Sequence, residues 1–434
     1  MRREKTAFVL AGGGSKGAYE CGALIALNKM GIKADMVCGS SSGALVGALY
    51  CQNDLKIAVE MFSELETDDL FEIKNDATIW DYAKAFIFRN GSDPKGLREG
   101  INKYIKEEQI RKSRVDFGLV TVEIPRIKGH YLWKDDIPYG KMHDYILASA
   151  SAFPMVKFHE FDGKKFIDGA YIDVMPVDMA LKHGATKVYA IDLLRNGIER
   201  KRNKTNDQEI LIISSKWELG FPLDFNSDKQ RSMLKMGFLD TCKALGKYDG
   251  VYFCFEKRSF KDKSTLLAAD SCGRFFNLNP AAVYNRRNFI HHLKTAINRF
   301  ENSGEYNEQK AMDTLSAVLT SNSLDDVGKD EGYGTIVLAM AAKMMRDGSE
   351  CVLNNSVLPA IFDETLTAAR FIVDNHLYQL PKEHGILTRT SACFHRHVLN
   401  NFSPSIILNR ITGRHFVHNI RKRYRKRKNK KSKR

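Results

Sequence analysis

Hydrophobic and polar residues alternate along the first 256 residues with two different periods. Short, mostly apolar runs are typical of buried strands, whereas longer stretches with apolar residues at helical spacing predict helices. The predicted strands are 5–11, 35–39, 115–124, 187–193, 209–213 and 251–255, and the predicted helices are 15–30, 42 onward, 54–65, 79–88 and 94–105. This alternation predicts an α/β fold whose mostly parallel sheet is covered by helices on both faces.

The pattern changes beyond about residue 257, where helical spacing dominates. Helices are predicted at 285–300, 308–319, 334–345 and 358–376, with 258–263 as a linker. From residue 412 the sequence is low in complexity and dense in positive charge, and like charges repel one another. We therefore expect a helical C-terminal region over 257–411 and a disordered basic tail over 412–434.

Length and composition indicate an ordinary globular protein. The 434 residues suffice for a large domain and a smaller one, and no apolar run approaches the roughly 18–20 residues that span a bilayer. Arg2, Arg3 and Lys5 precede an apolar run as in a signal peptide, but Lys16 and Glu20 interrupt that run, so we expect no signal peptide. Eight scattered cysteines without a C-x-x-C pair favour a reducing cytoplasm over a disulfide framework.

The net charge of +15 belongs to the C-terminal tail. Residues 410–434 carry 13 Lys or Arg and no acidic residue, whereas the rest of the chain has 54 basic residues against 52 acidic ones. Such a tail suits an anionic lipid surface, where each basic residue contributes about 1 kcal/mol. It equally suits non-specific binding of nucleic acid, or it is simply a solvated charged end.

A glycine loop follows the first predicted strand. Gly12, Gly14 and Gly17 form a G-x-G-x-x-G pattern between a strand and a helix, which is also the pattern of a dinucleotide-binding turn. Glycines let backbone N–H groups approach a negative charge, either a pyrophosphate or the oxyanion of acyl transfer. A dinucleotide site needs an acidic residue at the end of the next strand, but Asp35 opens that strand. That strand closes instead on Gly39, Ser40 and Ser41, and this serine turn favours the oxyanion hole.

The second predicted strand ends in a serine turn. Gly39, Ser41 and Gly43 form the G-x-S-x-G pattern of a nucleophile elbow, in which small flanking residues allow a sharp strand-to-helix turn. The helix that follows places its positive end behind the Ser41 hydroxyl. The alternative is a Ser/Gly-rich loop in which Ser42 caps a helix.

A serine nucleophile needs a base, and Asp168 is the local candidate. It follows the strand-like pair 166–167 and precedes Gly169 and Ala170, so its carboxylate is held at a tight turn. Taken alone, an Asp-Gly pair is more often a plain β-turn. A Ser-His-Asp triad would instead call on His183, which lies at a predicted helix end.

With these motifs together, the chain resembles the patatin-like phospholipases over residues 6–195. The G-G-G-x-[KR]-G, G-x-S-x-G and D-G-[GA] motifs of that family stand at 12–17, 39–43 and 168–170, and 148–154 and 173–177 are also similar. The family commonly has Thr where this chain has Ser40, which keeps a small hydroxylic residue. The resemblance implies a three-layer α/β sandwich for 6–195, with 196–256 completing the α/β domain.

The resemblance also implies a role for each motif residue. Ser41 is the expected nucleophile and Asp168 its proton acceptor, in a dyad without histidine. Gly12, Gly13 and Gly14 are expected to supply oxyanion-hole N–H groups. The supporting motif residues are Lys16, Gly17, Gly39, Gly43, Gly169 and Ala170. Lys16 would orient a phosphate or carboxylate of the substrate, unless it is a solvated residue in the first turn of a helix.

The expected function is that of a cytoplasmic lipid acyl hydrolase of the phospholipase A or lysophospholipase type. It acts through an acyl-Ser41 intermediate and needs no cofactor or metal, since the sequence shows no clustered ligand set. With a lipid hydrolase body, peripheral contact of the 412–434 tail with an anionic membrane is favoured over nucleic acid. The alternatives are a carboxylesterase or thioesterase for small acyl esters, or a non-enzymatic protein that binds nucleotides or nucleic acid.

Overall fold

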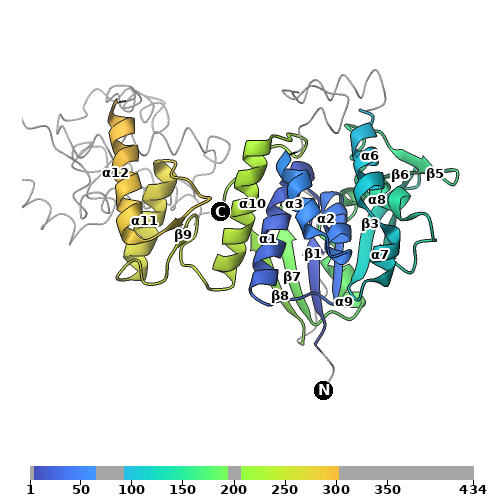
Figure 1. Ribbon diagram of the computed structural model, residues 1–434, viewed down its shortest axis with the longest axis horizontal. Helices are drawn as coiled ribbons and strands as arrows, with labels where there is room; N and C mark the ends of the chain where they lie inside the picture. The colour runs from blue at the N-terminus through green and yellow to red at the C-terminus, as the bar shows by residue number, and fades with distance from the viewer. Residues whose placement is uncertain (1–3, 65–91, 194–206, 303–434) are drawn as a thin grey trace, which may run out of the picture. The chain divides into compact units, whose positions relative to one another are not determined.

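The computed structural model describes residues 4–64, 92–193 and 207–302. The helices predicted at 79–88, 308–319, 334–345 and 358–376, and the tail at 412–434, lie outside these residues. The chain divides into two compact units, each of which is described by itself: 1–249 with 280–283, and 250–279 with 284–434 (Figure 1).

The first unit is built on an eight-stranded sheet. Its five parallel strands stand in the order β3-β2-β1-β7-β8. Antiparallel strands extend it beyond β3. The parallel strands are β1 (Thr6–Leu10), β2 (Met36–Ser40), β3 (Asp116–Ile124), β7 (Lys187–Asp192) and β8 (Glu209–Ser214), and the antiparallel ones are β4 (Lys128–Trp133), β5 (His159–Phe161) and β6 (Lys164–Asp168).

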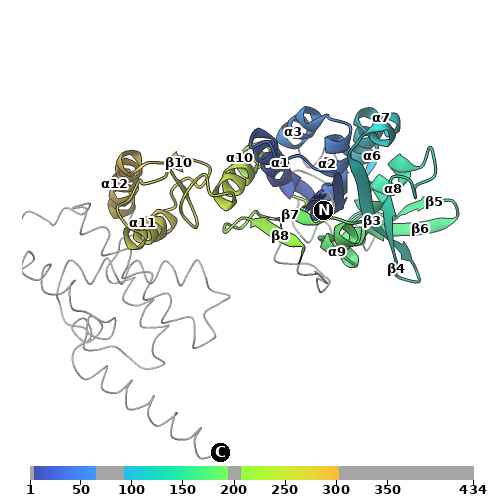
Figure 2. The ribbon, with the colours of Figure 1, turned by 90° about the horizontal axis from the view of Figure 1, so that it is seen from below.

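Helices cover both faces of this sheet (Figure 2). On one face lie α1 (Gly17–Lys29), α2 (Ser42–Cys51) and α3 (Leu55–Glu64), while α9 (Val177–Lys182) packs on the other face against β1, β2 and β7. The other helices among the described residues of the unit are η1 (Gly14–Lys16), α6 (Lys95–Tyr104), α7 (Glu107–Lys112), α8 (Met142–Ser149), η2 (Gly169–Tyr171) and α10 (Ser227–Ala244). The predicted α/β fold with a mostly parallel sheet is confirmed.

The topology of β3 explains how two distant segments meet. β4 pairs with residues 118–123 of β3, so it occupies one edge of that strand over this length. β2 pairs with the first part of β3, where Ser40 lies opposite Val120, and β6 with the last part, where Asp168 lies opposite Thr121. Because a strand has only two edges, β2 and β6 share the other edge, end to end. Their last residues therefore stand at neighbouring positions.

The second unit begins with the one strand prediction that is wrong. Of 251–255, only β9 (Cys254–Phe255) is a strand, and it pairs with β10 (Val283–Tyr284) instead of joining the main sheet. The reason is Asp270, whose carboxylate accepts hydrogen bonds from the N–H groups of Val251, Tyr252 and Phe253 at 2.8–3.0 Å. These N–H groups therefore cannot donate to a neighbouring strand. Helices α11 (Lys263–Phe275) and α12 (Arg286–Asn302) follow.

Candidate active site

Ser41 occupies a strained turn between β2 and α2. Its backbone is left-handed, with φ 54° and ψ −125°, which is rare for a residue other than glycine. The turn is possible because the residues two positions before and after Ser41 are glycines: a Cβ at Gly43 would lie 2.5 Å from the Leu10 carbonyl oxygen. A Cβ at Gly39 would lie 2.6 Å from the carbonyl carbon of Gly43. The geometry is that of a nucleophile elbow.

Buried hydroxyl groups hold this turn in place. The Ser41 N–H donates to Ser149 Oγ at 3.0 Å, and the Ser149 hydroxyl donates to the Val120 carbonyl at 2.7 Å. On the preceding residue, the Ser40 hydroxyl donates to the carbonyl of Asp173 at 2.7 Å. The elbow is thus tied to β3 on one side and to the segment after Asp168 on the other.

Asp168 ends β6 and is positioned by its own turn. Its Oδ1 accepts the Ala170 N–H at 2.8 Å, and its own N–H donates to the Ser151 carbonyl at 2.9 Å. Gly169 has to be glycine here, since a Cβ would lie 2.2 Å from the Val120 carbonyl oxygen. The Asp-Gly pair is therefore more than a surface β-turn: it packs closely against β3, the strand that pairs with β2 just before the elbow.

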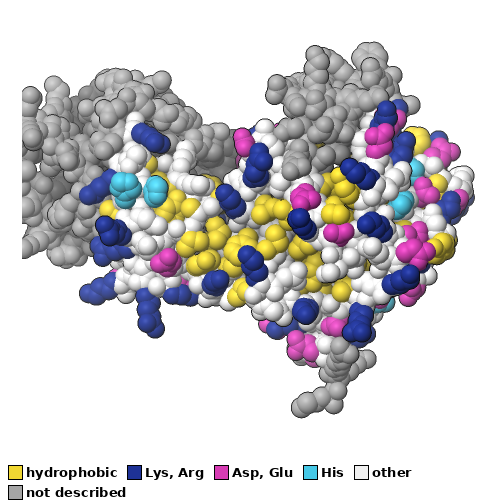
Figure 3. Space-filling view, in the orientation of Figure 1, with side chains coloured by type: hydrophobic (Ala, Val, Ile, Leu, Met, Phe, Trp, Pro, Cys, Tyr) yellow, Lys and Arg dark blue, Asp and Glu magenta, His cyan; other side chains and the backbone are white. Residues whose placement is uncertain are grey.

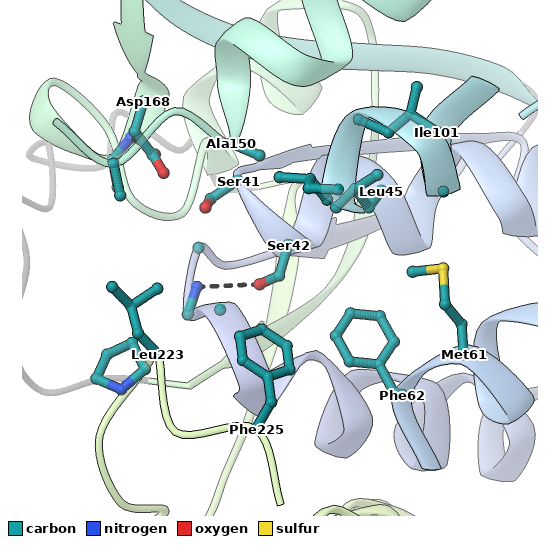
Figure 4. A pocket seen from close by; sticks show the side chains of 18 of the residues that line it. Ser41, Ser42, Leu45, Met61, Phe62, Ile101, Ala150, Asp168, Leu223 and Phe225 are labelled. Atoms are coloured by element: carbon teal, nitrogen blue, oxygen red, sulfur yellow. Dashed lines mark hydrogen bonds between the residues drawn. The ribbon is translucent and has the colours of Figure 1, made fainter. Parts of the chain in front are cut away.

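The electrostatics suit a carboxylate base. Asp168 is only 3% exposed, and burial raises its pKa to about 6, although the neighbouring Ser41 hydroxyl and the Ala170 N–H both act to lower it. The two side chains face the same space (Figure 4). A pKa near the working pH combines a largely deprotonated group with useful basicity.

The glycine loop lies beside this pair, and most of its N–H groups are engaged. The Gly12 N–H donates to the Val174 carbonyl at 2.9 Å, and the Gly13 N–H to Ser42 Oγ at 3.0 Å. For Gly14, whose φ is 58°, the described residues provide no backbone partner to its N–H. The Ser15 N–H donates to the Pro222 carbonyl at 2.7 Å, so a protein oxygen already occupies the place of a pyrophosphate. This arrangement disfavours a dinucleotide.

Lys16 and Gly17 complete the loop from inside the protein. Lys16 is buried, so it is not the solvated surface residue of the second interpretation. Burial lowers the pKa of its ammonium group, and the Glu218 carboxylate opposes this effect. A Cβ at Gly17 would lie 2.5 Å from the ring of Phe62, so glycine lets α3 approach the loop.

A cavity of about 430 Å³ opens beside Ser41 and Asp168. Its walls are almost entirely apolar, and the few polar groups belong to the glycine loop, the elbow and Asp168. Ser41, Leu45 and Leu49 follow one another at four-residue spacing, so the cavity runs along one face of α2. The other apolar side chains come from Met61, Phe62, Leu97, Ile101, Tyr104, Ile105, Ala150, Ala152, Met155, Ala170, Tyr171, Val174, Pro222, Leu223 and Phe225.

Comparison with known proteins agrees with this geometry. Residues 8–181 match the family model described as patatin-like phospholipase. This part of the chain is a patatin-like phospholipase domain. The resemblance seen in the motifs is confirmed.

The relatives of the patatin-like domain are much longer proteins. Lysophospholipase NTE1 of Mycosarcoma maydis is 31% identical over 192 residues, which are 43% of this chain and 9% of that protein. Patatin-like phospholipase domain-containing protein 7 of Rattus norvegicus is 28% identical over 189 residues, 43% of this chain and 13% of that protein. The chain thus spans about a tenth of these relatives. The crystal structure of VipD from Legionella pneumophila aligns with 87% of this chain and 92% of that chain, at 13% identity and a TM-score of 0.39, values that support no further conclusion.

In the first unit, just after the residues that match the family model, the structure separates His183 from the other candidate residues. His183 ends α9, stacks on Trp133, and places Nε2 2.6 Å from Asp116 Oδ2. Asp116 begins β3, about 13 Å along the strand from the level of Ser41. His183 therefore lies at the N-terminal ends of the parallel strands, whereas Ser41 follows the C-terminal end of β2.

Two kinds of residue escaped the motif analysis. Ser149, which holds the elbow, lies in a stretch noted only for its family resemblance. The cavity walls from α3, α6 and 221–225 carry no motif at all, because any apolar helix face has the same pattern.

In the described part of the chain, no group of three His, Cys, Asp or Glu residues is arranged to hold a metal ion. None of the described helices is long and apolar enough to cross a membrane.

Proposed function

We propose that this protein is a serine hydrolase that cleaves carboxylic esters of lipids, as a phospholipase A or lysophospholipase does. The observation that carries the proposal is the meeting of Ser41 and Asp168 at the head of a long apolar cavity. A lipid acyl chain matches such walls, while its ester carbonyl reaches the polar end. The relatives named lysophospholipase support the same substrate class.

The reaction follows from the positions of the groups. Ser41 Oγ attacks the ester carbonyl carbon while Asp168 takes the hydroxyl proton, and Asp168 then returns this proton to the leaving alcohol. Water, deprotonated by the same carboxylate, hydrolyses the acyl-Ser41 ester and regenerates the serine. No other proton carrier is required.

The oxyanion is assigned to the glycine loop, with unequal shares among its residues. The Gly14 N–H is the donor that needs no rearrangement, and the Gly13 N–H becomes available when Ser42 Oγ yields it to the substrate oxygen. The Gly12 N–H holds the loop to Val174, so Gly12 positions the loop instead of donating to the oxyanion. The positive end of α2 adds to this stabilisation.

A fluorophosphonate probe tests the nucleophile directly. We expect wild-type protein to be labelled and Ser41→Ala to be unlabelled, while Ser113→Ala, at the other edge of the sheet, is labelled like wild type. An unlabelled wild-type protein, or equal labelling of Ser41→Ala, would contradict the proposal. Digestion of total membrane lipid by wild type and Ser41→Ala then identifies the head group and acyl chain; cleavage of small soluble esters alone would point to the carboxylesterase alternative.

The basic tail belongs to a separate part of the proposal. Membrane contact through 412–434, or nucleic-acid binding as its alternative, concerns residues outside those that the structure describes. Binding of full-length protein and of a 412–434 deletion to anionic vesicles at moderate salt tests it, and unchanged binding by the deletion would remove it.

A further inference from the structure

The turn between β3 and β4 carries an unusual surface. Its three residues, Pro125, Arg126 and Ile127, are all exposed, as is Lys128, the first residue of β4, and Ile127 is 67% exposed. We call residues 125–128 the tip. A large aliphatic side chain that lies between two cations and is two-thirds exposed contributes little to the core.

The tip stands on the active-site side of the sheet. The ends of β2 and β6, which carry the catalytic pair, lie opposite Val120 and Thr121 of β3. β3 continues in the same direction to Ile124 before the chain turns. The tip therefore projects about 13 Å beyond the level of Ser41 and Asp168.

Contacts join the tip to the mouth of the cavity. The side chain of Ile172 lies directly over Gly129, the residue after the tip, where an added Cβ would be 3.0 Å away. Two residues further along β4, the Tyr131 hydroxyl donates to Asp173 Oδ2 at 3.3 Å. Tyr171, between Asp168 and these contacts, lines the cavity and is 40% exposed. β4, which continues from the tip, is thus in contact with the segment that follows Asp168.

The charge of the tip is not neutralised by its neighbours. Glu123 lies opposite Lys128 in the ladder, but its carboxylate contacts His130 at 3.0 Å and Lys164 at 3.4 Å. Neither Arg126 nor Lys128 forms an ion pair with any residue that the structure describes. Two cations without an ion-pair partner among the described residues therefore flank the exposed isoleucine.

Folding provides no reason for isoleucine at this position. Ile127 has a φ of 47°, a left-handed conformation that is disfavoured for a β-branched side chain. Glycine or asparagine would fit the turn better. The side chain thus costs conformational free energy, gains little burial within the described protein, and fits an external apolar phase.

We propose that the tip docks the enzyme on an anionic lipid surface, with Ile127 entering the boundary between headgroups and acyl chains and Arg126 and Lys128 contacting lipid phosphates. Tyr171 then meets the interface at the mouth of the cavity, where an aromatic ring with a polar end is favoured. The proposal rests on the proposed lipid hydrolysis for its purpose, but the docking itself is measurable without catalysis. It concerns described residues and is independent of the 412–434 tail.

Vesicle co-sedimentation of full-length protein carrying Ser41→Ala tests the docking. The vesicles are phosphatidylcholine with or without phosphatidylserine. On this background, Arg126→Glu with Lys128→Glu should lower partition into phosphatidylserine vesicles by about 30-fold or more, and Ile127→Asp by about tenfold. The matched control is Lys33→Glu with Arg114→Glu, two exposed cations that precede β2 and β3 at the opposite edge and change the net charge equally.

The control pair should bind nearly as tightly as the parent. If the Arg126→Glu, Lys128→Glu variant and the Lys33→Glu, Arg114→Glu control lose vesicle binding equally, net charge alone explains the loss and the proposal is overturned. It is also overturned if the parent fails to bind phosphatidylserine vesicles, or if the tip pair loses affinity for a single-stranded oligonucleotide while keeping it for vesicles.

Hydrolysis separates docking from chemistry. In the protein with Ser41 intact, Ile127→Asp should keep its kcat/KM for a soluble short-chain ester and lose about tenfold on phospholipid vesicles. Equal losses on both substrates would mean that the tip acts through the fold, contrary to the proposal. A wild-type protein that hydrolyses neither substrate would defeat the proposed function, while the co-sedimentation result would still decide the docking.

Discussion

Ser41 and Ile127 share a left-handed backbone, with φ values of 54° and 47°, yet their surroundings are opposites. Ser41 is buried, with its N–H hydrogen-bonded to Ser149 and glycines on both sides. Ile127 is exposed at the end of a hairpin, and no described side chain holds it. Other left-handed positions, such as Asn53 and Asp162, carry side chains that tolerate this conformation.

This difference shows two ways in which a strained residue persists. Such a conformation costs about 1–3 kcal/mol. At Ser41 the packed surroundings impose the conformation, so the strain is enforced from outside the residue. At Ile127 the left-handed conformation is imposed only by the turn of a two-strand hairpin. A residue that tolerates this conformation would fit there without other changes. The first position therefore indicates chemistry, and the second indicates an external contact.

The largest expected effect concerns Asp168, the base that we propose for Ser41. Asp168→Asn should lower kcat by about 10²–10⁴-fold with the fold intact, because the amide cannot accept the serine proton. In wild type, the pKa of Asp168 is raised to about 6. Since the base works deprotonated, kcat/KM should be flat above this pH and fall tenfold per pH unit below it. A pH–rate profile on a soluble ester measures both effects.

The same pH–rate measurement can contradict the role of Asp168. Full activity of Asp168→Asn, or an acid limb that stays when Asp168 is replaced, would remove Asp168 from the mechanism. His183 would then return as a candidate, despite its place beside Asp116 at the other edge of the sheet.

The second effect tests whether packing imposes the elbow. Gly43→Ala should destabilise the first unit by about 1–3 kcal/mol, because its Cβ would stand 2.5 Å from the Leu10 carbonyl oxygen. The matched control is Gly47→Ala on the same helix, where the nearest atom is a Val37 methyl carbon at 3.1 Å. All three tryptophans lie within residues 1–249, so their fluorescence in urea follows this unit. Equal losses in the two variants would contradict the packing argument.

The turns at Ser41 and Asp168 could be predicted from the sequence because their constraints are local, whereas the catalytic roles of the two residues stay predictions. A serine between glycines after a strand predicts a sharp turn wherever that strand lies in the sheet. The same holds for an aspartate before Gly169. The sequence did not predict how they meet. β6 is short and begins with two lysines, Lys164 and Lys165, so its place at the edge of β3 depends on strand pairing that no periodicity reveals.

Elements that depend on distant partners were the ones missed. α10 has polar residues scattered around it, and its burial comes from close packing on α1: a Cβ at Gly237 would lie 1.9 Å from the Tyr19 carbonyl oxygen. The strand predicted over 251–255 failed for a similar reason, since Asp270 takes its N–H groups from a distance in sequence. The cavity likewise needs helices α2, α3 and α6 together.

The third effect measures the strain at Ser41 itself. Ser41→Gly should stabilise the first unit by about 1 kcal/mol relative to Ser41→Ala, because both variants lack the hydroxyl but only glycine accepts a φ of 54° freely. Both variants should be inactive. Urea unfolding followed by tryptophan fluorescence gives the difference, and equal stabilities would mean that the elbow is not strained.

The smallest effect completes the comparison at Ile127. Ile127→Asn should stabilise the first unit by about 0.5–1 kcal/mol, because asparagine tolerates the left-handed conformation and no buried contact is lost. Unlike Ser41→Gly, it should leave hydrolysis of a soluble ester unchanged while weakening binding to anionic vesicles. A destabilised Ile127→Asn would show that the isoleucine serves the fold. The two strained positions would then differ in exposure alone, and the argument for an external partner at the tip would fail.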